Sequence, residues 1–439
     1  MSPTEHTSIE TLYAIFQKQH VIITDSRQIT EGCIFFALTG DNFDGNLFAE
    51  NALQKGAAYA VVDNPIYVKN NQYLLVENVL TTLQHLARHH RRQFDIPLIA
   101  ITGSNGKTTT KELMATVMES QYNTLFTRGN LNNHIGVPLT LLNISDEHEV
   151  AIIEMGANHV GEIHTLCTIA EPTHGLITNI GKAHLEGFGG IEGVKQGKSE
   201  LYRWLSAHRG RAFVNEDEPF LRDLLPLNLL PILYHRSENL SMQTPQYQAH
   251  LEAISPFLTV KFLDEKGEIL TAPTHIIGEY NFNNIMTAIA VGKYFKVPAR
   301  KIRHAITAFV PSMNRSQIVE YQGATVIMDA YNANPSSMKQ ALLNLAQMPQ
   351  RRKVAILGDM RELGETSIAE HANMLNLAKS LPFDAFITVG MSFGSVNTEG
   401  VHFQTNDEAK AWFQSQIFDK DTCILIKGSR GMKLEILTQ

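Results

Sequence analysis

Short apolar runs rich in valine and isoleucine alternate along this chain with stretches in which apolar residues recur every three or four positions. The first pattern is typical of buried parallel strands, and the second of amphipathic helices. The main strand-like runs lie at residues 98–102, 150–155, 174–180, 211–215, 325–330, 353–360, 385–390 and 423–429. Helical patterns separate these runs, which predicts an α/β fold with mainly parallel sheets and helices on both faces.

The same alternation predicts three domains. Residues 1–78 contain short strands and an amphipathic helix, which predict a small α/β domain. The pattern over residues 79–311 predicts a central domain with a mainly parallel sheet. Residues 247–275 are expected to add an antiparallel insert to it. Residues 312–439 return to the alternating pattern and predict a Rossmann-like third domain.

A glycine-rich turn follows the first strand of the central domain. The sequence TGSNGKTTT places Gly103 and Gly106 between this strand and a helix that begins near Lys107. Such a turn can direct backbone N–H groups at a phosphate, while the lysine adds charge and Thr108 a hydroxyl ligand for Mg²⁺. The long P-loop pattern would need glycine where this chain has Ile101, so only the shorter G-x-x-G-K-[ST] pattern is met. The alternative is an ordinary strand–helix turn with a solvated lysine.

Composition narrows the range of functions. The chain has 439 residues, of which 44% are hydrophobic and 18% charged, and its net charge is −7. No long basic stripe is present, so we expect no nucleic-acid partner. Three scattered cysteines, a polar N-terminus and the absence of a long apolar run predict a cytoplasmic protein without a membrane span.

Two polar residues follow neighbouring strands of the central domain. Glu154 ends the run VAIIE, and His184 lies in GKAHLEGFGG after the next strand. Because ligands collect at the carboxyl ends of parallel strands, these residues could hold Mg²⁺ together with Thr108. Taken singly, Glu154 could equally cap the next helix, and His184 could be an ordinary loop residue.

Other polar residues give weaker signals. The helical pattern around Lys198 favours a solvated lysine, and asparagines 130, 132 and 133 could simply stabilise turns. The amides of GEYNFNN could contact a base or cap their helix. These alternatives remain open from the residues alone.

The motifs taken together resemble the Mur ligase family over nearly the whole chain. In order they are TGSNGKTTT, GNLNNHIGVPLTLL, IIEMGANHVGEI, TNIGKAHLEGFG, GKSELY, GEYNFNNIMTAIAV, DAYNANPSSM, LGDMRELGE and KGSRGMKLE. GNLNNHIGVP and DAYNANP are most similar to the branch that joins D-alanyl-D-alanine to UDP-N-acetylmuramoyl-tripeptide.

The resemblance implies an ATP-dependent ligase of peptidoglycan synthesis that uses Mg²⁺. ATP phosphorylates the terminal carboxylate of the tripeptide, and the amine of D-alanyl-D-alanine attacks the acyl phosphate. We expect a monomer. The third residue of the tripeptide, diaminopimelate or lysine, stays open.

The resemblance also implies roles for individual residues. Those implied to bind ATP are Gly103, Ser104, Asn105, Gly106, Lys107, Thr108, Thr109, Asn281, Asn284, Arg315 and Asp329. Those implied to bind the peptide substrates are Asp25, Ser26 and Arg27 for the uridine nucleotide, and Asn130, Asn132, Asn133, Tyr331, Asn332 and Asn334. The implied metal ligands are Thr108, Glu154, His184 and Lys198, the last as a carbamate. The implied catalytic residues are Lys107, His184, Lys198 and Arg315.

Two positions depart from the family pattern. Tyr280 replaces the usual histidine, which leaves its role open, and Asn314 replaces a common glycine, which predicts a stiffer or differently shaped hinge. The rivals are a folylpolyglutamate synthase, the ligase that adds the third stem residue, and a nucleotide-binding switch without ligation chemistry. The motif DAYNANP argues against the first two. A nucleotide-binding switch would need neither a second acidic–histidine site nor two further domains.

Overall fold

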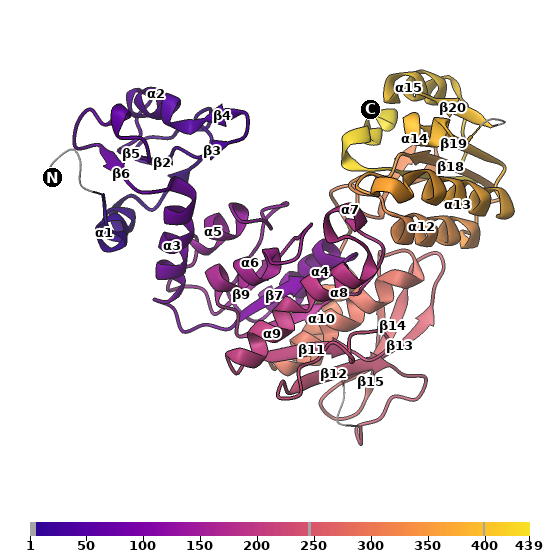
Figure 1. Ribbon diagram of the computed structural model, residues 1–439. Helices are drawn as coiled ribbons and strands as arrows, with labels where there is room; N and C mark the ends of the chain where they lie inside the picture. The colour runs from indigo at the N-terminus through magenta and orange to yellow at the C-terminus, as the bar shows by residue number, and fades with distance from the viewer. Residues whose placement is uncertain (1–5, 245–246, 398–399) are drawn as a thin grey trace. The chain divides into compact units, whose positions relative to one another are not determined.

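The computed structural model describes residues 6–244, 247–397 and 400–439 (Figure 1). The described chain forms two compact units. Unit 1 contains the residues up to Ala100 together with 124–156 and 164–173. Unit 2 contains 101–123, 157–163 and 174–439.

Unit 1 begins with a small parallel sheet. Its strands, in the order β1-β2-β5-β6, are β1 (Ile22–Ile23), β2 (Ile34–Phe36), β5 (Tyr59–Val62) and β6 (Tyr73–Leu75). The helices are α1 (Ile9–Gln19), α2 (Ala49–Gln54) and α3 (Val79–Arg91), and a short hairpin pairs β3 (Thr39–Gly40) with β4 (Phe43–Asp44). The expected α/β character of the N-terminal domain is confirmed, and β6 is an additional strand.

Strand β7 (Leu98–Thr102) is fully buried and contributes residues to both units. In unit 1 it is followed across the sheet by β9 (Val150–Glu154) and then β8 (Thr124–Phe126). This unit also contains α5 (Gly136–Leu141) and most of α6 (Glu162–Ala170). In unit 2 the strands that follow β7 are β10 (His174–Ile177), β11 (Arg211–Asn215) and β12 (Pro231–Arg236). These strands run parallel to one another.

The predicted antiparallel insert is present in unit 2. It consists of β13 (Tyr247–Ala253), β14 (Thr259–Leu263) and β15 (Ile269–Pro273), which form two antiparallel pairs. Strand β12 was not predicted, and it joins the insert to the sheet by pairing in parallel with both β11 and β13. The helices beside this sheet are α4 (Lys107–Glu119), α7 (Leu185–Phe188), α8 (Ile191–Lys198), α9 (Glu200–Ala207), α10 (Phe282–Tyr294) and α11 (Ala299–Ala308).

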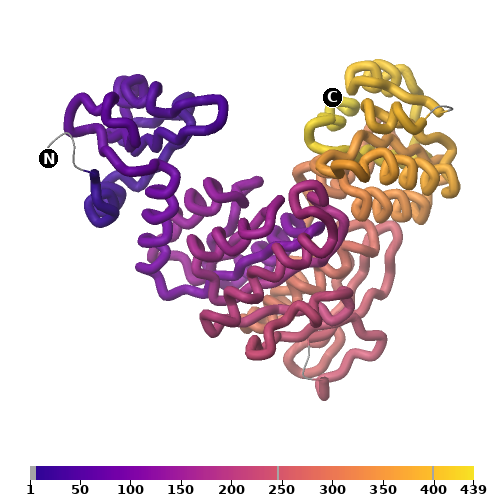
Figure 2. Tube along the Cα trace, viewed as in Figure 1, coloured from indigo at the N-terminus to yellow at the C-terminus, as the bar shows by residue number. Residues whose placement is uncertain are grey.

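The C-terminal part of unit 2, orange to yellow in Figure 2, has its own sheet of order β16-β17-β21-β18-β19-β20. The strands are β16 (Gln317–Tyr321), β17 (Ala324–Asp329), β18 (Arg352–Gly358), β19 (Ala385–Val389), β20 (Val401–Phe403) and β21 (Thr422–Lys427). Only β16 is antiparallel to its neighbour. The helices are α12 (Pro335–Gln347), α13 (Ser367–Ser380), α14 (Met391–Gly394) and α15 (Asn406–Ser415).

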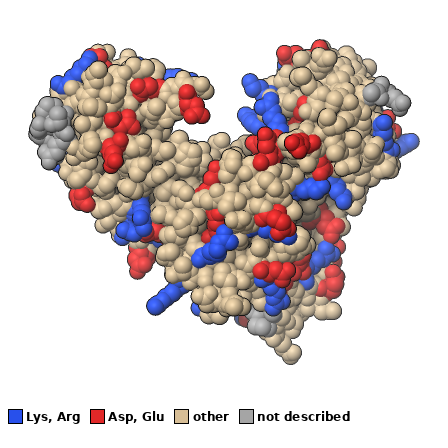
Figure 3. Space-filling model, viewed as in Figure 1, with Lys and Arg blue, Asp and Glu red and all other residues tan. Residues whose placement is uncertain are grey.

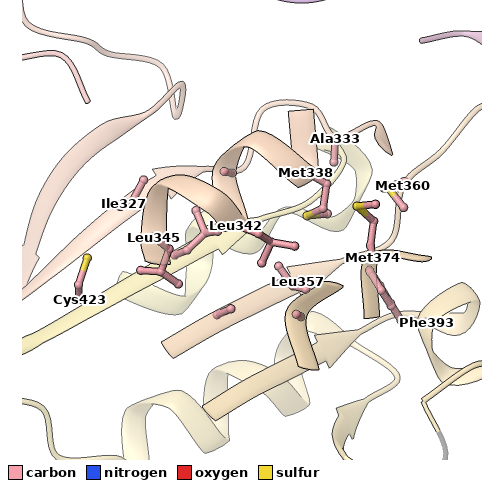
Figure 4. Close-up of a cluster of buried hydrophobic side chains, with 14 of the residues drawn as sticks. Ile327, Ala333, Met338, Leu342, Leu345, Leu357, Met360, Met374, Phe393 and Cys423 are labelled. Atoms are coloured by element: carbon pink, nitrogen blue, oxygen red, sulfur yellow. The ribbon is translucent and has the colours of Figure 1, made fainter. Parts of the chain in front are cut away.

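Both faces of this C-terminal sheet are buried, as the continuous apolar runs predicted. Along β17, Ile327 packs into one hydrophobic cluster, while its neighbours Val326 and Met328 pack into another. The first cluster includes Met338, Leu342 and Leu345 of α12 (Figure 4), and the second includes Phe413 of α15. Because side chains alternate across a strand, this division shows helices on both faces. The α/β fold with helices on both faces is confirmed.

The molecular surface is of mixed charge. Acidic and basic side chains are interspersed over the face shown in Figure 3. Among the described residues, no helix is long and apolar enough to cross a membrane.

Candidate functional site

The glycine-rich turn between β7 and α4 has a positive φ at two positions, where the lack of a Cβ favours glycine. Gly103 has φ +140° and Gly106 has φ +79°. A Cβ at Gly103 would lie 2.0 Å from Thr178 Oγ1, and one at Gly106 would lie 2.6 Å from Asn284 Oδ1. The glycines therefore permit both the turn and the close packing behind it.

The segment after β10 braces this turn. Thr178 Oγ1 donates to Asn105 O at 2.6 Å, and Asn179 Oδ1 accepts from Asn105 N at 3.0 Å. Ser104 exchanges hydrogen bonds through its hydroxyl with the backbone of Gly181, at 3.1 and 2.9 Å. Four contacts to one short loop fix its shape before any ligand arrives.

The N-terminus of α4 is suited to an anion. Gly106 is the N-cap residue and supplies no side chain to the first turn, so backbone N–H groups there point out of the helix end. Lys107 folds back over the loop, and its Nζ donates to Gly103 O at 2.7 Å and Ser104 O at 3.2 Å. Thr108 follows and is buried. This arrangement can bind a phosphate group.

The asparagines of GEYNFNN support the loop from behind. Asn284 Oδ1 accepts from Thr110 Oγ1 at 2.9 Å, and its Nδ2 donates to Asn281 Oδ1 at 2.7 Å. Asn281 Nδ2 in turn donates to Ile277 O at 2.8 Å. Both side chains are buried, so their amides hold α10 against α4; the contact with adenine stays a prediction.

A pocket lies beside the first turn of α4. The hinge arginine Arg315 faces into it, and its Nε is buried without a hydrogen-bond partner in the part of the chain that the structure describes. The guanidinium lies 3.7 Å from the centroid of the Tyr331 ring. The lining residues are Thr108, Thr109, Glu112, Phe309, Pro311, Ser312, Met313 and Arg315.

The hinge segment contains three non-glycine residues with positive φ. Met313, Asn314 and Ser316 have φ +57°, +55° and +50°, which are left-handed values that asparagine tolerates better than most residues. Tyr280 supports this segment because its buried hydroxyl lies 2.8 Å from Ser316 Oγ. Burial, followed by the nearby Asp329 charge, raises the pKa of Tyr280, so it stays a neutral hydrogen-bonding group.

Residues of the DAYNANP motif begin at the carboxyl end of β17. Asp329 Oδ2 accepts from Lys427 Nζ at 2.6 Å, and Asp329 Oδ1 accepts from Ser316 N at 3.3 Å. Asn332 folds its side chain back, and its Oδ1 accepts from Ala333 N at 2.9 Å.

Asn334 connects this motif to the glycine-rich turn. Its Oδ1 accepts from Ser337 N at 2.9 Å and caps α12, while its Nδ2 donates to Asn105 Oδ1 at 2.7 Å. The structure thus brings a predicted substrate residue against a predicted nucleotide residue.

Lys198 is buried at 1% exposure, so the interpretation as a solvated lysine is wrong. Its Nζ donates to Ala157 O at 3.1 Å and lies 5.1 Å from the centroid of the Phe188 ring. Burial, and then the charge of Lys107, hold the pKa of Lys198 well below its ordinary value, against the opposing effect of Glu162 and Glu200. Such a lysine has an increased fraction of neutral amine.

His184 has φ +52°, and its Nδ1 contacts Glu362 Oε2 of the C-terminal part. No cluster of three or more histidine, cysteine or acidic side chains suited to a metal occurs in the described ranges.

In unit 1, Glu154 ends β9 and is buried. Asn132 Nδ2 donates to Glu154 Oε1 at 2.8 Å, which fixes the orientation of the carboxylate. Asn133 Oδ1 accepts from Ile135 N and Gly136 N at 3.1 and 2.9 Å and so supports the start of α5. Asn130 is exposed in the same loop.

The TDSR segment forms an exposed turn after β1. Arg27 Nη2 lies 2.7 Å from Asp25 Oδ2, and hydrogen bonds from Arg27 lower the pKa of Asp25 to about 2. Ser26 O accepts from Lys55 Nζ at 3.2 Å. The arginine side chain is 87% exposed and available to a ligand.

Sequence reasoning missed several residues that shape this site. Lys427 is one of them, and its Nζ donates to Asp329. It ends the apolar run CILIK, and a charged residue at the end of a predicted strand is a signal that could have identified it. The loop braces Thr178 and Asn179 also follow a strand. The ion pair between Lys182 and Glu370 has no comparable local signal.

Three family models match successive parts of the chain. Residues 18–93 match "Mur ligase family, catalytic domain", residues 101–292 match "Mur ligase middle domain", and residues 314–430 match "Mur ligase, glutamate ligase domain".

Similar proteins cover nearly the whole chain. The UDP-N-acetylmuramoyl-tripeptide–D-alanyl-D-alanine ligase of Bacillus subtilis is 34% identical, covering 95% of this chain and 92% of that protein. The ligase of the same name from Escherichia coli is 32% identical, covering 94% and 92%.

Solved structures give the same picture. A crystal structure of MurF from Acinetobacter baumannii is 30% identical and covers 99% of this chain and 98% of that one, with a TM-score of 0.85. MurF ligase from Thermotoga maritima in complex with ADP is 26% identical and covers 95% and 96%, with a TM-score of 0.82.

Proposed function

This chain belongs to the Mur ligase family, and we propose that it joins D-alanyl-D-alanine to UDP-N-acetylmuramoyl-tripeptide at the expense of ATP. The observation that supports this function most strongly is the similarity, over 95% of the chain, to a ligase named for that reaction. The glycine-rich turn and the pocket beside it fit the nucleotide that the reaction requires.

The ATP phosphates bind Gly103 to Thr109. The first turn of α4, which has no side-chain cap, and the positive-φ loop that the two glycines permit fit a phosphate chain. Arg315, whose buried Nε has no partner in the ranges the structure describes, supplies a cation on the other side of the pocket. Asp329 contacts the nucleotide near its phosphates and ribose. Asn281 and Asn284 lie on the side of the adenine. Lys107, Arg315 and the backbone N–H groups of the turn stabilise the charge of the phosphoryl group as it moves to the tripeptide carboxylate.

Thr108 and Glu154 would hold Mg²⁺, because their hydroxyl and carboxylate oxygens are the hard donors that this ion prefers. Asn132, hydrogen-bonded to Glu154, keeps the carboxylate oriented. When bound, the ion neutralises phosphate charge. His184 and Lys198, the latter as a carbamate, would hold a second ion.

Carbamylation of Lys198 requires its neutral amine. The buried environment that lowers the pKa of Lys198 favours that form. The carbamate replaces a buried ammonium group, which would repel a cation, with an anionic oxygen donor.

The peptide substrates bind at two places. Asp25, Ser26 and Arg27 hold the uridine nucleotide, and the exposed Arg27 guanidinium suits its phosphates. Tyr331, Asn332 and Asn334 help to hold the dipeptide. Asn130, Asn132 and Asn133 of the GNLNN loop also serve in substrate binding. The dipeptide amine then attacks the activated carboxyl carbon and phosphate leaves.

We also propose the domain bounds 1–78, 79–311 and 312–439, a monomeric state and a cytoplasmic location. The bounds are supported by the start of α3 at Val79 and by the hinge that follows α11.

Phosphate release in the presence of ATP and Mg²⁺ tests the function. We expect release only when both UDP-tripeptide and D-alanyl-D-alanine are added, and a competition between diaminopimelate- and lysine-containing UDP-tripeptides identifies the third residue. Release with a folate and glutamate instead would favour a folylpolyglutamate synthase, and release with ATP alone would favour a nucleotide switch.

A further inference from the structure

Lys427 is a buried lysine at the carboxyl end of a central strand. It ends β21, and its residue is only 1% exposed. Its Nζ donates to Asp329 Oδ2 at 2.6 Å and to Asn332 O at 3.2 Å. Asp329 and Lys427 are register partners on neighbouring parallel strands.

A buried ammonium group is costly, so its surroundings must compensate for lost hydration. The preceding residues Leu425 and Ile426 are fully buried in the two apolar clusters of this sheet. An apolar residue would continue that pattern without cost. The lysine is compensated by Asp329 and by one backbone carbonyl, both at the end of the sheet that faces the site.

Each contact of Lys427 leads to a different part of the site. Through Asn332 O it holds the loop whose Asn334 donates to Asn105 of the glycine-rich turn. Through Asp329, which accepts from Ser316 N, it holds the hinge residue next to Arg315.

We propose that Lys427 is a positioning residue of the ligation reaction, which holds the loop 330–334 and the hinge at 315–316 in the arrangement that receives the dipeptide. This inference rests on the proposed function. Lys427 acts through Asp329 and Asn332 and touches neither substrate. Without its ammonium group, the Asp329 carboxylate loses its cation, and the Asn332 carbonyl loses a donor.

Steady-state kinetics of Lys427→Met test this role. We expect the KM for D-alanyl-D-alanine to rise and kcat to fall, with kcat/KM for the dipeptide reduced by about tenfold to a hundredfold, as for other groups that orient a site from behind. The KM for ATP should rise less than the KM for the dipeptide, because Thr178 and Asn179 hold the glycine-rich turn, whereas Lys427 reaches the ATP site only through Asp329 and the hinge.

Lys353→Met is the matched control. Lys353 lies in β18 of the same sheet, and its Nζ donates to Ala346 O at 2.7 Å. Its register partner on β21 is Cys423, near the opposite end of that strand from Lys427. Both KM values should stay at their parental levels in this variant.

Thermal melting separates positioning from folding. A variant that is only less stable would have unchanged KM values. Its apparent kcat would fall only at temperatures where part of the protein is unfolded, in proportion to the folded fraction. Lys427→Gln, which keeps a hydrogen-bond donor, serves if the methionine variant does not fold, and the same shift in dipeptide KM is expected. An unchanged dipeptide KM in a folded variant would overturn the proposal, whereas failure of the parent enzyme to release phosphate would overturn the proposed function instead.

Discussion

Lys182 Nζ lies 2.6 Å from Glu370 Oε1, so a lysine of the middle-domain match is paired with a carboxylate of the C-terminal match. The Glu370 side chain is 10% exposed, whereas that of Lys182 is 54% exposed. Lys182 N also donates to Ser336 Oγ at 3.3 Å, at the start of α12. The segment that braces the glycine-rich turn is therefore also held by α12 and α13.

Reversing either charge of this pair should impair catalysis, and reversing both should restore it. Lys182→Glu places two carboxylates together, and Glu370→Lys places two ammonium groups together. We expect kcat/KM to fall about fivefold in each single variant, a value kept modest because Lys182 is half exposed. The double variant should recover most of that loss. Purely additive losses in the double variant would show that the pair has no coupled role.

Replacing Lys107 with methionine should abolish ligation while leaving the fold intact. The substitution keeps most of the length of the side chain but removes the charge that stabilises the transferring phosphoryl group. The expected loss in kcat is at least about a hundredfold. Activity within threefold of the parent enzyme, in a variant with an unchanged melting temperature, would contradict the role given to this residue.

Lys198→Ala should inactivate the enzyme, and a short carboxylic acid such as acetate should partly rescue it by occupying the position of the lost carbamate. Lys195→Ala is the control, because Lys195 lies in the same helix and pairs with Glu192 at 2.7 Å. That variant should be active and indifferent to acetate. An inactive Lys198 variant that no carboxylate rescues would remove the support for carbamylation, and a fully active one would remove the catalytic role altogether.

The stability of the protein should fall as the pH drops from about 6.5 to about 4, in part because of His174. Burial, and then the charge of Arg211, lower the pKa of His174 to about 4. The unfolded chain therefore binds a proton near pH 6.5 that the folded chain does not yet bind, and protonation favours unfolding across this range. The expected contribution is on the order of 2–3 kcal/mol.

Denaturant unfolding at several pH values measures this effect. His174→Gln should flatten the pH dependence, although it also loses the contact with Tyr294. His304→Gln, at an exposed position of α11, is the control and should keep the parental slope. Equal slopes in all three proteins would show that His174 does not cause the acid sensitivity.

Local patterns predicted most of the buried central strands and the glycine-rich turn, because these depend on nearby residues, whereas short strands such as β6, β8 and β20 were not predicted. Strand β12 was missed because its residues are mostly half-buried, so neither alternation nor a continuous apolar run marks it. The solvated interpretation of Lys198 was wrong because burial of a helical lysine depends on tertiary packing, and only the family resemblance pointed to that residue. The partner of Lys427 lies 98 residues away, a pairing that depends on sheet register rather than on local sequence.

The central claim is that the tripeptide carboxylate is activated by ATP and then joined to the dipeptide. UDP-N-acetylmuramoyl-tripeptide with oxygen-18 in its terminal carboxylate, incubated with the enzyme, ATP, Mg²⁺ and D-alanyl-D-alanine, tests this claim by mass spectrometry of both products. We predict a UDP-linked pentapeptide and released phosphate that contains one labelled oxygen, because the carboxylate oxygen leaves with the phosphoryl group. Unlabelled phosphate, or labelled substrate recovered without any pentapeptide, would contradict it.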